Sequence, residues 1–68
     1  MNNNIDTQIE ETAEELRDTC ADCSAEDLYA MAEDEHLWAM GSDNDEDATM
    51  HEINADAYRL LAEEKENQ

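Results

Sequence analysis

Negative charge is almost unopposed along this chain. Of its 68 residues, 21 are Asp or Glu and only three are Lys or Arg, which gives a formal net charge of −18 at pH 7. Repulsion among so many like charges works against any compact state. We therefore expect a marginally stable fold that is helped by salt, by a partner chain, or by both.

The chain is long enough for one small domain and no more. A domain of this size buries only about 60% of the surface that its unfolded chain exposes, which leaves no room for a deep enclosed active site. The sequence also lacks a glycine-rich loop, an activated serine and a phosphate cradle. We therefore expect no enzymatic activity and no cofactor.

The spacing of the apolar residues predicts an all-α fold with helices over about 5–20, 25–40 and 47–64, and no strand. In the first segment apolar residues recur every three or four positions, as one face of a helix requires, and the other two segments carry apolar residues that could form a buried side. The expected faces are Ile5, Ile9, Thr12 or Ala13, Leu16, Cys20 and Cys23; Leu28, Ala32, Leu37 and Ala39; and Met50, Ile53, Ala57, Leu60 and Leu61. Short connections favour a small three-helix bundle, and a helical hairpin that dimerises is the alternative.

Several polar residues stand where helix ends are expected. Ser24 is a suitable N-cap for the second helix, with Asp27 completing a weakened capping box. Gly41, the only glycine, is expected at the C′ position that follows this helix. Any of Ser42, Asp43 or Asp47 could cap the third helix.

Nothing in the sequence suggests a membrane protein or a secreted one. No stretch approaches the ~18 apolar residues of a membrane span, and the N-terminal segment lacks the basic and apolar regions of a signal peptide. We expect a cytoplasmic protein that is repelled by nucleic acid and by anionic lipid. Its natural partners are basic protein surfaces.

The acidic residues of the first helix form two rows. Glu10, Glu14, Asp18 and Asp22 are spaced i, i+4, with Glu11 and Glu15 one position over. Each step rises about 6 Å along the helix axis, similar to the phosphate spacing of a nucleic-acid strand. Each such like-charge pair costs roughly 0.2–0.5 kcal/mol of helix stability. The full set of candidate partner-binding carboxylates is Glu10, Glu11, Glu14, Glu15, Asp18, Asp22, Glu26, Asp27, Glu33, Asp34 and Glu35.

These rows favour a surface that imitates the phosphate backbone of DNA, because an ordinary solvated face interleaves Lys with Glu. A solvated acidic face, as in a halophile protein or an acidic tail, is the alternative. In composition the whole chain resembles the small DNA-mimic inhibitors of phages and mobile elements, which include anti-restriction proteins, anti-CRISPR proteins and inhibitors of uracil-DNA glycosylase. The resemblance implies a stoichiometric inhibitor that evades host defence by blocking a nucleic-acid site in a host protein.

The remaining chemistry-bearing residues have structural interpretations and functional ones. Cys20 and Cys23 form a C-x-x-C motif that, with His36 and His51, makes a conceivable zinc set in a small regulatory interaction module. We favour small buried thiols, with a redox pair as a further alternative. Trp38 is expected to anchor the core, and a contact residue beside the acidic face is its alternative role.

Overall fold

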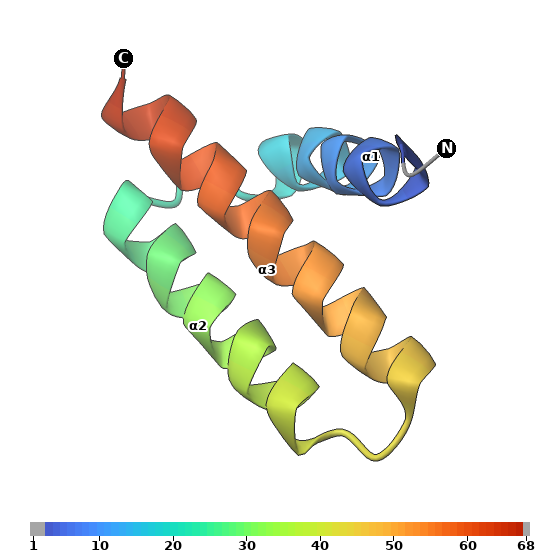
Figure 1. Cartoon of the computed structure of the whole chain (residues 1–68). Coiled ribbons are helices and arrows are strands. Elements are labelled where there is room, and N and C mark those ends of the chain that lie inside the picture. The colour runs from blue at the N-terminus through green and yellow to red at the C-terminus, as the bar shows by residue number, and fades with distance from the viewer. Residues whose placement is uncertain (1–2, 68) are drawn as a thin grey trace.

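The computed structural model describes residues 3–67, which form three α-helices (Figure 1). Helix α1 spans Asn3–Thr19, α2 spans Ala25–Gly41 and α3 spans Asp45–Glu66. No strand occurs within this range. The expected three-helix fold is confirmed, although α3 begins and ends two residues beyond the predicted bounds of 47 and 64.

Helix α3 is the platform to which both other helices are attached. It packs along α2 in an antiparallel hairpin, and α1 crosses it (Figure 1). The backbones of α1 and α2 do not pack against each other; each packs against α3. The molecule measures 36 × 27 × 17 Å, so its thinnest dimension is less than two helix diameters of about 10–12 Å. Of residues 4–19 in α1 only Ala13 is buried, so most of the surface of this helix is left in solvent.

The core is built largely from alanine. The buried side chains are Ala13, Cys20, Leu28, Ala32, Ala39, Ile53, Ala55, Ala57, Leu61 and Ala62. Leu28 is the only large side chain among the described residues that is fully enclosed. Alanine lets helices pack closely, but it removes little apolar area from water, and stabilisation scales with that area. The core therefore buries little apolar area for a chain that carries so much like charge.

Four residues expected on the buried faces are exposed instead. Ile5, Leu37 and Met50 are 52%, 56% and 55% exposed, and Trp38, the expected core anchor, is 62% exposed. For Ile5, Leu37 and Trp38 the reason is that α1 and α2 each pack on α3 alone, which covers a narrow face of each helix. On α2 the covered face carries Leu28, Ala32 and Ala39, and the turn between the two alanines presents Glu35 and His36 to α3.

The helix ends confirm one predicted cap and correct two others. The capping box is present, since Ser24 Oγ accepts a hydrogen bond from the Asp27 amide at 3.1 Å. Gly41 is the last residue of α2 instead of lying beyond it, and Ser42 is the C-cap in an extended conformation. Asn44 caps α3, because its Oδ1 accepts from the Glu46 amide at 2.8 Å. That register places three acidic residues in the first turn of α3, where the helix dipole favours negative charge.

Truncation of Leu28 should test how much of the stability depends on this one enclosed side chain. We expect Leu28→Ala to lower the free energy of unfolding by about 2–5 kcal/mol, because no other large side chain of the described core is so fully enclosed. The matched substitution Leu37→Ala removes the same atoms from an exposed site on the same helix, and should change it by less than about 0.5 kcal/mol. Urea denaturation followed by circular dichroism measures both. Equal losses would contradict this description of the core.

Candidate acidic partner-binding surface

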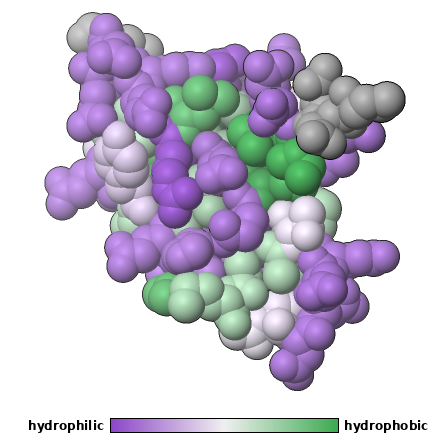
Figure 2. Space-filling view, viewed as in Figure 1, coloured by the Kyte–Doolittle hydropathy of each residue, from purple (hydrophilic) through white to green (hydrophobic). Residues whose placement is uncertain are grey.

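The predicted carboxylates lie along α1, around the turn that follows it, and on α2. Ten of the eleven are exposed: Glu10, Glu11, Glu14, Glu15, Asp18, Asp22, Glu26, Asp27, Glu33 and Asp34. The row of Glu10, Glu14 and Asp18 points away from α3 because apolar side chains of α1 fill the face that packs on the core. The row of Glu11 and Glu15 borders α3 across a hollow. Seen from one side, the molecule is covered mainly by hydrophilic side chains, with apolar patches between them (Figure 2).

The three basic side chains all contact groups outside this set of carboxylates. Arg17 makes a bidentate contact with Glu64, at 2.9 Å for the Nη2–Oε2 pair. Arg59 pairs with Asp56 at 3.0 Å, and Lys65 donates to the Ala21 carbonyl at 3.0 Å. Within residues 4–67, none of the eleven predicted carboxylates therefore has a Lys or Arg partner.

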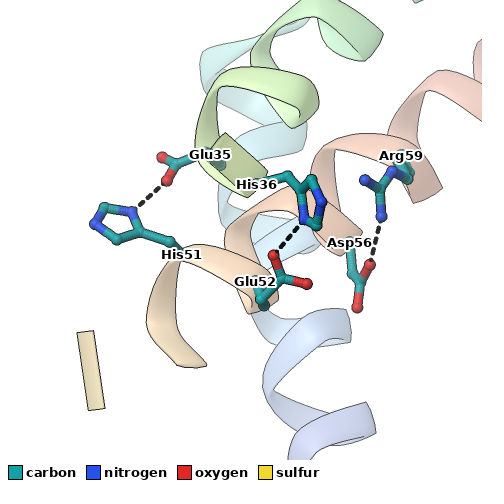
Figure 3. Close-up of polar contacts among 6 residues, drawn as sticks. All are labelled: Glu35, His36, His51, Glu52, Asp56 and Arg59. Carbon is teal, nitrogen blue, oxygen red and sulfur yellow. Dashed lines mark hydrogen bonds and ion pairs between the residues drawn. The ribbon is translucent and has the colours of Figure 1, made fainter. Parts of the chain in front are cut away.

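Glu35 differs from the other ten because it belongs to the contact between α2 and α3. Its carboxylate meets His51 Nδ1 at 2.5 Å, and the next residue, His36, meets Glu52 at 2.7 Å (Figure 3). The two acid–imidazole pairs lie side by side. In one pair α2 supplies the carboxylate and α3 the imidazole, and in the other pair the roles are reversed. The Glu35 side chain is only 15% exposed, so it is less available to a partner than the rest of the set.

Trp38 lies beside this paired cluster and at the surface. Its ring centroid is 5.5 Å from that of His51, with the planes tilted by 56°. It also lines a hollow of about 200 Å³ with Met31, Asp34, Glu35 and Tyr58. Two members of the acidic set therefore share a hollow with an exposed tryptophan, which agrees with the alternative role of Trp38 as a contact residue.

The structure does not bring the four conceivable zinc ligands together. Cys20 and Cys23 lie at the turn between α1 and α2, where the Cys23 amide donates to the Cys20 carbonyl at 3.0 Å. His36 and His51 are instead paired with Glu52 and Glu35. Among residues 3–67, no three side chains of the His, Cys, Asp and Glu types are placed to hold one metal ion.

The two thiols are free and differ in exposure. Cys20 is buried in the core and Cys23 is partly exposed beside it. Burial raises the pKa of the Cys20 thiol, and the hydrogen bond and charge of neighbouring Cys23 raise it further. Nearby Lys65 opposes this shift. Cys20 therefore has the properties of a small core residue, as the sequence led us to favour.

Sequence reasoning missed the contacts that hold the end of α3. The Tyr29 hydroxyl donates to Glu66 at 2.7 Å, which raises the pKa of the tyrosine because the bond favours its protonated form. Together with the Arg17–Glu64 and Lys65–Ala21 contacts, this bond ties α1 and α2 to the C-terminal part of α3. The partners are 37 to 47 residues apart in sequence, so no local pattern could have identified them.

Comparison with known proteins finds no match, whether with protein-family models, with curated proteins or with solved structures. Within the described part of the chain, no helix combines the length and the apolar character that crossing a bilayer requires. What the protein does must therefore be inferred from its own residues.

Added salt should stabilise this protein. Raising sodium chloride from about 0.01 M to about 1 M shortens the screening length from roughly 30 Å to roughly 3 Å, which weakens repulsion between the unpaired carboxylates more than it weakens the few ion pairs. We expect the melting temperature to rise, as circular dichroism can measure. Glu14→Gln with Asp18→Asn removes two charges from one row and should reduce the response. A melting temperature that falls with salt would show that attractive pairs dominate.

The two thiols should react at different rates in the folded protein. Only the thiolate is nucleophilic, and Cys20 is both buried and raised in pKa. At neutral pH we expect iodoacetamide to modify Cys20 several-fold more slowly than Cys23, with the sites distinguished by fragmentation mass spectrometry. The difference should disappear in urea. Equal rates in the folded state would mean that the turn between α1 and α2 opens freely.

Proposed function

We propose that this protein is a small, non-enzymatic inhibitor that imitates the phosphate backbone of DNA and occupies the basic nucleic-acid-binding surface of a host protein. The observation that carries the proposal is the exposed carboxylate set on α1 and the following turn. Its six members have no Lys or Arg partner within residues 4–67: Glu10, Glu11, Glu14, Glu15, Asp18 and Asp22.

The placement of α1 supports this role. The helix is held along one face by α3 and by the Arg17–Glu64 contact, so its remaining faces are open to a partner. A regular helix holds its carboxylates at a repeat of about 6 Å per four residues. Lys and Arg side chains that normally contact successive phosphates can then contact successive carboxylates. Because the scaffold is fixed by its core, little ordering entropy is lost on binding.

The acidic set continues onto α2. Glu26 and Asp27 occupy its first turn, next to the end of α1, and Glu33 and Asp34 follow further along. Trp38 adds an exposed aromatic side chain at the hollow that Asp34 lines. Tryptophan is enriched among residues that dominate binding energy. Trp38 is thus the first candidate for an apolar contact beside the charged ones.

Charge of this magnitude also sets the kinetics of the proposed interaction. Long-range attraction to a basic groove speeds association, and the gain falls as salt is added. The targets that fit are proteins with basic DNA-binding grooves: restriction enzymes, CRISPR effectors, repair enzymes, nucleoid proteins and RNA polymerase.

A second candidate function is a small regulatory module that binds a protein partner through apolar side chains. The exposure of Leu37, Trp38 and Met40, at 56%, 62% and 71%, favours it. Such an interface would depend only weakly on ionic strength, whereas a DNA mimic would lose affinity steeply as salt is added. Affinity measured over a salt series therefore separates the two functions.

Reversal of three charges on α1 tests the proposal. Glu11→Lys, Glu14→Lys and Asp18→Lys together place like charges against a basic groove, which costs several kcal/mol and so about a hundredfold or more in affinity. We expect the variant to lose its inhibition of a DNA-binding target captured from host lysate and released by competing duplex DNA. The measurement is competition with labelled DNA for the purified target.

The control for this experiment carries the same change in net charge elsewhere. Asp43→Lys, Asp47→Lys and Glu63→Lys also reverse three exposed carboxylates, but outside the proposed surface. This variant should retain most of the inhibition, and circular dichroism should show both variants folded. Unchanged inhibition by the α1 variant, or equal loss in both, would refute the assignment of the surface to α1.

A further inference from the structure

An open apolar groove lies between the first turn of α1 and the loop end of the α2–α3 hairpin. Its cavity volume is about 400 Å³, and its apolar lining consists of Ile5, Ala39, Met40, Ala48 and Ile53. Ile5 and Met40 are 52% and 71% exposed although they are large and apolar. In the view of Figure 2, apolar surface is bordered by hydrophilic side chains.

One edge of the groove carries charge. His36, Glu52 and Asp56 line it, with Glu52 held by His36 and Asp56 held by Arg59 (Figure 3). Both carboxylate side chains are 45% exposed, so each can accept further hydrogen bonds from a partner.

The acidic rows of α1 adjoin the same region. A second hollow, also about 400 Å³, is lined by Glu11, Glu15, Met50 and Ile53 among others. The two hollows share Ile53. An occupant of the apolar groove would therefore lie next to carboxylates of the proposed mimic surface.

Charge decides which occupant fits the groove. A second copy of this chain would bring another formal charge of −18 against a surface edged by Glu52, Asp56, Glu11 and Glu15, and like-charge juxtaposition of this kind opposes association. A cationic segment meets attraction at the same edge. The volume lies at the low end of the roughly 300–1,000 Å³ of ligand pockets, which suits one large side chain.

We propose that this groove binds a large aliphatic side chain of the basic partner, carried on a segment whose Lys or Arg residues contact Glu52 and Asp56. The inference rests on the proposed function and makes it more specific, because a DNA duplex offers no such side chain. Through the groove the inhibitor would contact an aliphatic side chain of the target protein that bound DNA does not contact. Binding then has a component that salt does not screen, since burial of apolar surface is not an electrostatic interaction.

Two synthetic peptides test the groove directly. Both are short and lysine-rich and have the same charge; one has a central leucine and the other a serine at that position. We expect the leucine peptide to bind the intact protein about tenfold more tightly, as calorimetry can measure, because burial of one such side chain is worth roughly this factor or more. The difference should persist at high salt while both affinities fall.

Variants then place the effect in the groove. Ile5→Ser with Met40→Ser alters two exposed lining residues and should remove the preference for leucine, while Leu37→Ser, equally exposed on α2 but outside the lining, should keep it. Circular dichroism checks folding. As a second measurement on the unaltered protein, the leucine peptide should shift the NMR signals of Ala39, Ala48 and Ile53. Equal binding of both peptides, or a preference that survives the double substitution, would overturn the proposal.

Failure of this inference can be told apart from failure of the proposed function. The α1 charge reversals leave Ile5, Met40 and the rest of the apolar lining intact, so they should weaken both peptides together and preserve their ratio. A lost ratio with DNA-competitive inhibition intact would refute only the groove. A preserved ratio without competition for any DNA-binding target would refute only the mimic.

Discussion

The contact between α2 and α3 is the interaction on which the rest of the molecule depends. It buries Leu28 and a series of alanines, and its middle is crossed by two acid–imidazole pairs, Glu35–His51 and His36–Glu52. Alanine allows the two helices to approach closely, and the pairs occupy positions where apolar residues would otherwise be expected. The hairpin therefore combines modest apolar burial with polar contacts between helices, in a chain where repulsion favours expansion.

The position of α1 follows from that hairpin. Because α3 alone supports it, α1 buries one narrow face and exposes its acidic rows. The three basic residues contact Glu64, Asp56 and the Ala21 carbonyl, and none of them pairs with a carboxylate of those rows. Both halves of the functional proposal depend on this geometry: the exposed rows are available to a basic groove, and the incomplete coverage between α1 and the hairpin leaves the apolar groove open.

Much of the fold could be predicted from local pattern. The apolar period gave three helices, and the capping box at Ser24 and Asp27 is present because it needs only residues three apart. The errors concern which side of each helix is covered. Leu37 was expected on the buried face of α2, yet it lies nine residues from Leu28, which at about 3.6 residues per turn places it on the opposite side of the helix. Glu35 takes the inward position between Ala32 and Ala39, where it pairs with His51 on α3. Such pairing depends on side chains 16 residues apart.

The candidate surface could likewise be predicted only as far as it depends on local sequence pattern. Exposure of the α1 carboxylates follows from the opposite apolar face, which the sequence shows directly. Within residues 4–67, the lack of a Lys or Arg partner for those carboxylates depends on where three cations find partners, which only the tertiary structure reveals. The apolar groove has no sequence signature, since its lining comes from all three helices.

The three cations all lie toward the same end of the hairpin. Arg17, Arg59 and Lys65 all make their contacts with the second half of α3 or with the turn between α1 and α2. At the opposite end, the α2–α3 loop and first turn carry Asp43, Asp45, Glu46 and Asp47 without a basic residue in that stretch. The centres of positive and negative charge are therefore displaced along the hairpin. This displacement gives the molecule a dipole, so the field of a basic surface exerts a torque on it in addition to the net attraction.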